Sequence, residues 1–242
     1  MKRMIDFKIE KIIPLCAQFG VDITDEQKQK LNLYGNLLLE WNEKINLTAI
    51  TEPEEVLYKH FYDCILFLKH IEIPKNSTLI DVGTGAGFPG MVLKIVRPDI
   101  EVTLLDSLNK RLVFLNDVIE KLELLGIKTV HSRAEDAGKN KLYREKYDFA
   151  TARAVAALPV LLEYCTPLVK KGGMFVAMKG PSGKEECDAS VNAAKVLNVT
   201  EPKIICEALN QDTERTFIVF KKISQTAPKY PRKPSDISKQ PL

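Results

Sequence analysis

The stretch 77–90 constrains the fold of this chain more than any other part of the sequence. It opens with the apolar run 79–82, which is typical of a strand covered on both faces. Three glycines then let the backbone turn sharply and approach a ligand closely: Gly83, Gly85 and Gly87. Pro89 suits the first turn of a following helix, whose N-terminus attracts negative groups. The stretch therefore predicts a strand, a ligand-binding loop and a helix.

Two classes of cofactor use such a loop. A nicotinamide site closes on a pyrophosphate, and residues 85–90 satisfy its G-x-G-x-x-G spacing. Against that reading, Asp81 ends the strand, where a carboxylate repels a pyrophosphate but can hold a cationic ligand such as S-adenosylmethionine. Asp106 ends the next predicted strand, 101–105, where an acid can accept both ribose hydroxyls of either cofactor. An ordinary strand-turn-helix, with glycines required only for packing, is the alternative.

The composition favours one α/β domain with a short N-terminal addition. A chain of 242 residues can bury roughly 70 to 75% of its extended surface without disulfides or metals. Its net charge of +3 is too small to demonstrate nucleic-acid binding. Its five cysteines are widely spaced and lack C-x-x-C pairs, which predicts reduced core residues in a cytoplasmic protein. We expect neither a signal peptide nor a transmembrane helix, because no apolar stretch suits either.

Residues 1–70 are predicted to form a helical extension packed on the main domain. An amphipathic segment runs over 5–19, and Thr24 with Gln27 forms a capping box for a helix that reaches about residue 43. The segment 51–54 predicts a second capping box, with proline in the first turn of its helix. His60 and Asp63 lie one turn apart on that helix. A metal pair, a catalytic dyad and a structural His–Asp contact are the alternatives there.

The segment 71–223 alternates predicted strands with helices and forms the main domain. A helix is predicted over 109–125, and further strands at 127–131, 147–152 and 174–178. Charged residues stand at or just beyond the carboxyl ends of the predicted strands: Asp81, Asp106, Glu135, Arg153 and Lys179. Ligands bind outside these ends in an open parallel sheet, so we expect the five side chains to line one edge. Lys110 and Arg111 open a helix where its dipole disfavours positive charge, which indicates either function or solvated surface.

The segments 203–208 and 215–222 predict an antiparallel hairpin, joined by a turn at 210–213, at the edge of the sheet. Such a hairpin is the usual end of methyltransferases with this fold and is unusual for a nicotinamide domain. The remaining tail, 224–242, is basic, and its prolines predict an extended rather than helical chain. It suits contacts with phosphates, and a disordered solubilising end is the alternative.

The sequence resembles the bacterial ribosomal RNA small-subunit methyltransferase G family, also called glucose-inhibited division protein B. The resemblance rests on the loop 81–90 and covers nearly the whole chain. Its other motifs are Trp41-Asn42, Asn46-Leu47-Thr48, His60 with Asp63, Asp106-Ser107, Lys110-Arg111, Arg133-Ala134-Glu135, Arg153-Ala154, Lys179-Gly180 and Tyr230-Pro231-Arg232. It implies a Rossmann-like class I S-adenosylmethionine-dependent methyltransferase fold, with a mostly parallel sheet, a closing antiparallel hairpin and an N-terminal helical extension. It also implies methyl transfer to N7 of one guanine in 16S rRNA, near the decoding region.

The resemblance and the strand-end positions together give three sets of candidate site residues. The cofactor set is Asp81, Gly83, Gly85, Gly87, Phe88, Asp106, Ser107, Leu108, Ala134, Glu135 and Arg153. The RNA-binding set is Asn46, Lys110, Arg111, Arg133, Lys179 and Arg232. The catalytic set is Arg153 and Lys179, which are expected to orient guanine O6, a phosphate or the methionine carboxylate rather than to act as bases.

The implied chemistry agrees with what the sequence lacks. Guanine N7 carries a lone pair and no proton, so it can attack a sulfonium methyl group without a general base. The Asn/Asp-Pro-Pro-aromatic motif typical of exocyclic-amine methyltransferases does not occur, and Cys165 lacks the motif of C5 methyltransferases. We expect 16S rRNA or the small ribosomal subunit as partner, no metal, no membrane and a monomer. The alternatives are a methyltransferase with another acceptor, an RNA-binding ribosome-assembly factor and a nicotinamide-dependent oxidoreductase.

Overall fold

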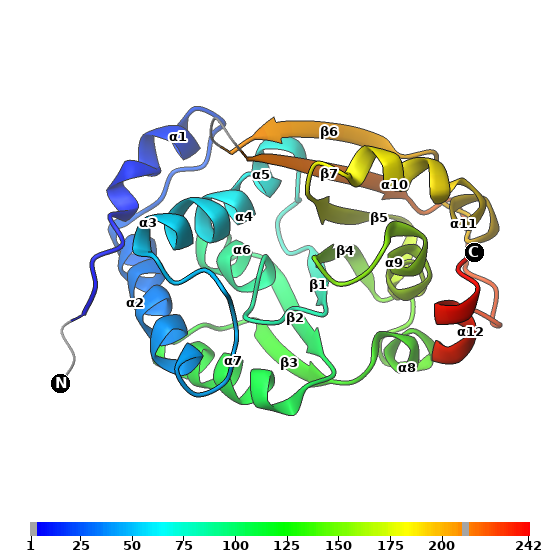
Figure 1. The fold of residues 1–242 in the computed structure, drawn as a ribbon, viewed down its shortest axis with the longest axis horizontal. Coiled ribbons are helices and arrows are strands. Elements are labelled where there is room, and N and C mark those ends of the chain that lie inside the picture. Colours follow the sequence, from blue (N-terminus) through cyan, green and yellow to red (C-terminus); the bar gives the residue numbers. More distant parts are fainter. Residues whose placement is uncertain (1–3, 210–212) are drawn as a thin grey trace.

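A seven-stranded sheet in the order β3-β2-β1-β4-β5-β7-β6 forms the middle layer of the computed structural model (Figure 1). The structure describes residues 4–209 and 213–242. Five strands run parallel: β1 (Thr78–Val82), β2 (Glu101–Asp106), β3 (Ile127–His131), β4 (Tyr147–Arg153) and β5 (Val169–Lys179). The hairpin of β6 (Lys203–Ala208) and β7 (Glu214–Lys221) adds antiparallel to β5 and confirms the predicted closing hairpin. Residues 210–212 of its predicted turn lie outside the described residues.

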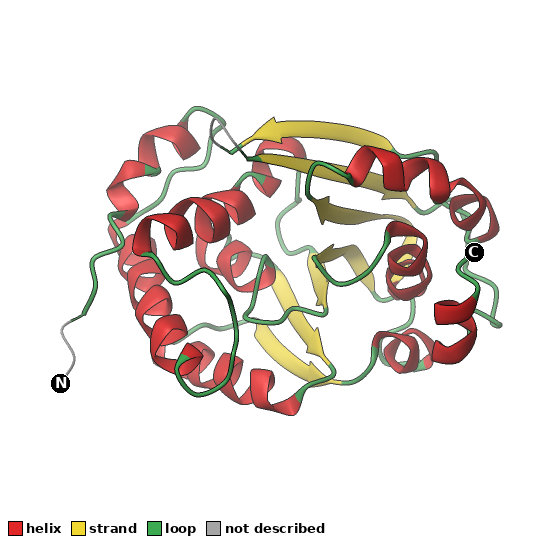
Figure 2. Ribbon diagram, viewed as in Figure 1, coloured by secondary structure: helices red, strands yellow, loops and turns green. Residues whose placement is uncertain are grey.

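Helices cover both faces of the sheet, as Figure 2 shows. Because side chains alternate along a strand, Leu79 joins one hydrophobic cluster and Ile80 the other. The first cluster packs beneath α2 (Asp25–Asn42), α6 (Gly90–Val96), α7 (Asn109–Lys121) and the short helices α3 (Pro53–Val56), η2 (Leu57–Tyr62), α4 (Asp63–Ile65) and α5 (Phe67–His70). The second packs beneath α8 (Ala134–Lys139), α9 (Leu158–Cys165), η3 (Thr166–Leu168), α10 (Gly183–Ala189) and α11 (Val191–Val196). The predicted α/β architecture is therefore confirmed.

The N-terminal helices differ in part from the prediction. The segment 5–19 is not one helix but two short ones, η1 (Ile9–Lys11) and α1 (Ile13–Ala17), because Pro14 fits only the first turn of a helix. The capping box of α2 is confirmed, since the side chains of Thr24 and Gln27 each accept a hydrogen bond from the other's backbone amide. The second predicted capping box is wrong: α3 begins at Pro53 after Glu52, without a side-chain cap.

Some predicted boundaries also move. Pro89 immediately precedes α6 as its N-cap instead of lying in its first turn. The helix expected over 109–125 ends at Lys121, and Glu123 then takes a left-handed conformation with φ 49°. Arg153 is the last residue of β4 instead of following it.

The tail 224–242 is not an extended free chain. Pro234 begins a helix, α12 (Pro234–Lys239), because proline is well suited to the first helical turn. Tyr230 belongs to the second hydrophobic cluster, and Ile237 is buried in α12, which contacts α9. Lys222, which precedes this tail, is also buried, and its ammonium group donates to the Glu145 carboxylate at 2.7 Å. The tail therefore belongs to the folded structure.

Four of the five cysteines are buried as predicted, whereas Cys206 is exposed because it lies on the edge strand β6. Among residues 4–209 and 213–242, none of the helices has the length and apolar character needed to cross a bilayer.

Candidate cofactor site

A cavity of about 560 Å³ lies at the carboxyl ends of β1, β2 and β4. Its lining includes seven predicted site residues: Gly83, Asp106, Ser107, Arg111, Arg133, Ala134 and Glu135. Other residues of the lining are Ser132, Ala154, Val155, Ala156 and Tyr164. This is the edge at which ligands bind in open parallel sheets. The structure thus brings together the acids Asp106 and Glu135, as the sequence predicted.

Asp106 ties together the two loops that bound this cavity. One of its carboxylate oxygens accepts the Gly85 amide at 2.9 Å, and the other accepts the Leu108 amide at 2.8 Å. The Arg111 guanidinium also donates to it, at 3.3 Å. Gly85 and Leu108 therefore shape the site through their backbones and do not themselves line the cavity. The Asp106 carboxylate, only 2% exposed, is held in place at the end of its strand.

Asp81 holds the glycine loop from beneath. Its buried carboxylate accepts the Thr84 hydroxyl at 2.7 Å and the Gly90 amide at 2.9 Å, while its other oxygen has no hydrogen-bond partner among the described residues. Burial raises the pKa of Asp81 to about 6. The side chain does not line the cavity, so direct contact with a cationic ligand stays a prediction.

The loop requires glycine at two positions. Gly83 has φ +68°, and an added Cβ would lie 2.7 Å from the Val155 side chain. Gly87 has φ +100°, and an added Cβ would lie 2.7 Å from the Tyr34 hydroxyl. That hydroxyl donates to the Ala86 carbonyl, so α2 of the N-terminal region fixes the loop directly. Larger residues at either position would displace the backbone that borders the cavity.

Arg153 lies in a buried network beside the cavity rather than on its wall. Its guanidinium donates to Asp63 at 2.8 Å and lies 4.8 Å from the centre of the Phe88 ring. The same Asp63 carboxylate, fully buried, also accepts two hydrogen bonds from Arg215, at 2.6 and 2.8 Å. Asp63 is thereby neutralised by two cations from β4 and β7. The predicted cofactor and catalytic contacts of Arg153 stay predictions.

His60 completes this network but does not bond to Asp63. Its Nδ1 lies 3.2 Å from the Arg153 guanidinium and its Nε2 lies 2.9 Å from the Thr48 hydroxyl. Its ring stacks on Phe88 at 4.4 Å between centres. Burial, and then the positive charge of Arg153, lowers the pKa of His60 to about 3. The expected direct His60–Asp63 contact is wrong, because Arg153 lies between the two side chains and binds both.

Lys179 and Arg232 point to internal partners. The Lys179 ammonium donates to the Ala156 carbonyl at 2.5 Å and pairs with Glu186 at 2.7 Å. Arg232 pairs with the buried Glu163, which accepts its side chain at 2.7 Å and its backbone amide at 2.7 Å. The predicted RNA contacts of both residues are untested, and in this structure neither charge is free.

The other predicted RNA-binding residues lie on the surface. Asn46 is exposed in a loop that Asn42 holds, since its side chain accepts the amides of Leu47 and Thr48 at 2.7 and 2.9 Å. Lys110 is exposed in the first turn of α7, next to Arg111 on the cavity wall. Sequence reasoning missed Val155 and Tyr164. Val155 follows a strand end, a position that could have suggested it, whereas no sequence pattern singles out Tyr164 on α9.

One protein family matches this chain over most of its length. The model of the family described as rRNA small subunit methyltransferase G matches residues 27–216. A protein named ribosomal RNA small subunit methyltransferase G from Acetivibrio thermocellus is 52% identical over 239 residues, which cover 98% of each chain. The protein of that name from Clostridium perfringens strain 13 is 50% identical over 232 residues, covering 94% of this chain and 95% of the relative.

Solved structures support the fold. A predicted O-methyltransferase from Agrobacterium tumefaciens aligns with a TM-score of 0.55 at 17% identity, over 67% of this chain and 81% of that chain. An S-adenosylmethionine-dependent O-methyltransferase from Thermotoga maritima aligns with a TM-score of 0.53 at 13% identity, over 78% and 72%. The fold predicted from the sequence is therefore confirmed. The family match, and not the fold, shows that the nicotinamide alternative is wrong.

Proposed function

Because this chain belongs to the rRNA small subunit methyltransferase G family, it is an S-adenosylmethionine-dependent rRNA methyltransferase, and we propose that it methylates N7 of one guanine in 16S rRNA. The cavity beside Asp106 and Glu135, at the carboxyl ends of parallel strands, carries the proposal. The guanine and its N7 atom follow from the family resemblance of the sequence. A cytoplasmic location is proposed from the widely spaced cysteines without C-x-x-C pairs, and the monomeric state stays a prediction.

The lining of the cavity fits S-adenosylmethionine. Asp106 and Glu135 offer acidic acceptors for ribose hydroxyls and an adenine amino group, and Gly83 leaves the backbone open to a close ligand. Arg111 also borders the cavity, and its Nε has no hydrogen-bond partner among the described residues. When bound, S-adenosylmethionine supplies the electrophilic methyl group. Asp106, Glu135, Gly83 and Ala134 are the residues that we propose hold it.

The chain's own contribution is to position the acceptor base. Guanine N7 is a hydrogen-bond acceptor without a proton, so its attack releases none and requires no general base. His60 is buried, neutral and bound to Arg153 and Thr48, which agrees with a positioning role. Orienting two reactants can contribute roughly 7 to 11 kcal/mol. The basic residues Arg111 and Arg133 on the cavity wall suit contacts with guanine O6 or a phosphate.

The form of the RNA substrate follows from groove geometry. In an A-form helix the major groove, where N7 lies, is deep and narrow. We therefore propose that the target guanine lies in an exposed loop or is flipped out of its stack.

The experiment is transfer of labelled methyl groups from S-adenosylmethionine to small ribosomal subunits, and separately to rRNA, prepared from cells that lack this protein. We expect N7-methylguanine at one position of 16S rRNA, with little transfer by an Asp106→Ala variant. Methyl groups at another atom or base would overturn the N7 assignment. Incorporation into protein or a small molecule instead would show another acceptor.

A further inference from the structure

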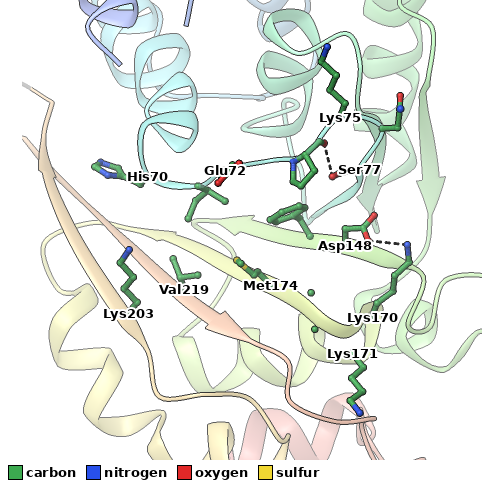
Figure 3. A pocket seen from close by; sticks show the side chains of 16 residues that line it. His70, Glu72, Lys75, Ser77, Asp148, Lys170, Lys171, Met174, Lys203 and Val219 are labelled. Carbon is green, nitrogen blue, oxygen red and sulfur yellow. Dashed lines mark hydrogen bonds and ion pairs between the residues drawn. The ribbon is translucent and has the colours of Figure 1, made fainter. Parts of the chain in front are cut away.

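A second cavity, of about 860 Å³, is drawn in Figure 3. It lies at the opposite end of the sheet from the cofactor site. Its lining includes Ser77 just before β1, Asp148 near the start of β4, and Lys170 near the start of β5. β1 runs from this cavity to the cofactor site, and its five residues span about 17 Å. The two cavities therefore cannot hold the same nucleotide.

Lysines from three separate segments border this second cavity, which we call the lysine groove. They are Lys75 before β1, Lys170 and Lys171 in β5, and Lys203 at the start of β6. The acids on the wall are Glu72 and Asp148, and Asp148 pairs with Lys170 at 3.1 Å. Within residues 4–209 and 213–242, the exposed ammonium groups of Lys75, Lys171 and Lys203 form no hydrogen bond or ion pair. The groove therefore keeps an excess of positive charge.

The spacing of these charges suits a chain of phosphates better than one small anion. Figure 3 shows Lys75 and Lys171 on opposite sides of the groove, and Met174 and Val219 between Lys203 and Lys170. A site for a single anion brings its donors together on one point, whereas a nucleic-acid strand carries one charge about every 3.4 Å. The apolar floor between the lysines offers a surface for riboses or bases.

Further lysines extend the positive surface beyond the groove. Lys146 is exposed immediately before β4. Lys221 is exposed at the end of β7, where it is the register partner of Met174. A smaller cavity shares Lys170 and Lys171 and continues towards Ser224. A strand of RNA could thus follow the amino ends of the sheet over several nucleotides.

The geometry points to the lysine groove as a second RNA-binding surface, which holds the phosphate backbone of a segment of the rRNA substrate remote from the target guanine. The inference rests on the proposed function. β1 is about 17 Å long, which equals about five base steps of about 3.4 Å each. The nucleotides held in the groove therefore lie at least about 17 Å from the target guanine. Lysines act as point charges on phosphates, so this surface contributes affinity and orientation rather than sequence specificity.

The test compares two triple variants with the same change in charge. Lys75→Gln, Lys171→Gln and Lys203→Gln are combined in one protein; Lys139→Gln, Lys141→Gln and Lys195→Gln, which are exposed lysines outside both cavities, are combined in the control. We measure binding to protein-free 16S rRNA between about 50 and about 300 mM salt, a range that includes 0.1 M, where the Debye length is about 10 Å. We then measure methyl-transfer kinetics on the active substrate.

For the groove variant we expect about tenfold or more weaker rRNA binding at about 0.1 M salt. The slope of log affinity against log salt should fall by about 2, since each lost phosphate contact contributes about 0.7 to 0.9. KM for the RNA substrate should rise by a similar factor, with kcat and S-adenosylmethionine affinity unchanged. The control variant should resemble the wild type.

Equal behaviour of the two variants would overturn the inference. Weaker binding to assembled subunits with unchanged binding to protein-free rRNA would also overturn it, because a ribosomal protein would then occupy the groove. The wild-type protein separates these outcomes from a failure of the proposed function. If it binds rRNA but forms no N7-methylguanine, the proposed function is wrong. The rRNA binding of the two variants still tests whether the lysine groove binds RNA.

Discussion

At the scale of single residues, His60 links three separate segments through one neutral ring. The Nδ1 of His60 lies 3.2 Å from the Arg153 guanidinium and 3.1 Å from the Lys59 carbonyl. Its Nε2 lies 2.9 Å from the Thr48 hydroxyl, in the loop that carries Asn46. Its ring meanwhile stacks on Phe88 of the glycine loop. A neutral imidazole therefore holds an exposed surface loop against the cofactor loop.

The lowered pKa of His60 gives stability a pH dependence. The native state keeps His60 neutral down to about pH 3, whereas the unfolded state protonates it at about 6.5. Its contribution is therefore fully present above pH 6.5 and is lost as the pH falls towards 3, by about 1.4 kcal/mol per unit. As the pH falls from about 7.5 to about 4, we expect the free energy of unfolding of the wild type to decrease more than that of His60→Gln. Urea denaturation at each pH measures both.

The comparison isolates His60 from other buried groups. Asp81, whose pKa is raised to about 6, changes stability in the opposite direction. Its contribution to stability is lost as the pH rises from 3.8 to about 6. Asp81 is present in both proteins, so its effect cancels in their difference. Parallel stability curves for the two proteins would contradict the assignment of His60 as a buried neutral group.

Asp106 combines a structural role with its predicted role in cofactor binding. Asp106→Ala should weaken S-adenosylmethionine binding roughly ten- to hundredfold, since a hydrogen bond to a charged group contributes about 1.5 to 3 kcal/mol. It should also lower the free energy of unfolding by about 1 to 3 kcal/mol, because the amides of Gly85 and Leu108 lose their acceptor. Calorimetric titration and urea denaturation measure the two effects.

Asp188→Ala removes an exposed acid from α10 and serves as the matched control. A loss of stability with unchanged cofactor affinity in Asp106→Ala would show that Asp106 only organises the loops.

At the scale of elements, the C-terminal segment is held by charge pairing with the second helical layer. Arg144 donates to the carbonyls of Thr226 and Tyr230, which fixes the path of the chain leading to α12. Arg232 then neutralises Glu163, a fully buried acid of α9. Because α12 has a buried Ile237 of its own, the segment is a packed element and its basic residues are not all available to RNA.

Arg232→Ala should destabilise the protein by about 3 kcal/mol, because it leaves the buried Glu163 carboxylate without its cation. The double variant with Glu163→Gln should recover much of this loss, since no buried charge remains. Lys233→Ala, which removes an exposed neighbouring charge, is the control. Thermal and urea unfolding measure the effect. Unchanged stability together with weaker rRNA binding would instead support the RNA contact that the sequence suggested.

At the scale of the whole molecule, the parallel sheet separates two surfaces with different chemistry. Its carboxyl ends bring together the glycine loop, Asp106 and Glu135. Its amino ends present Lys75, Lys171 and Lys203, which form no ion pair with the part of the chain that the structure describes. The helices of the N-terminal region reach the first surface through Tyr34, which binds the Ala86 carbonyl. An RNA that contacts both ends of the sheet would be oriented along the strands. The proposed boundaries of the helical extension at residue 70 and of the tail at 224 stay predictions.

Patterns along the chain predicted the strands, the glycine loop and the acids at the ends of β1 and β2. These features depend on interactions between residues close in the chain: apolar periodicity, glycine backbone conformations and capping. The predicted strand 127–131 and the capping box at Thr24 agree with the structure for this reason. The family motifs added the cofactor and the substrate, which no local pattern specifies.

The partners of the charged side chains depend on the packing of distant segments and were not predictable from the sequence. Arg153 binds Asp63, Lys179 binds Glu186 and Arg232 binds Glu163, although each had been expected at a ligand. The tertiary structure also decided that Tyr164 lines the cavity and that lysines far apart in sequence border one groove. A buried charge must find an opposite charge or hydrogen bonds wherever the packed elements supply them. That choice depends on how distant segments meet in space, which spacing along the chain does not encode.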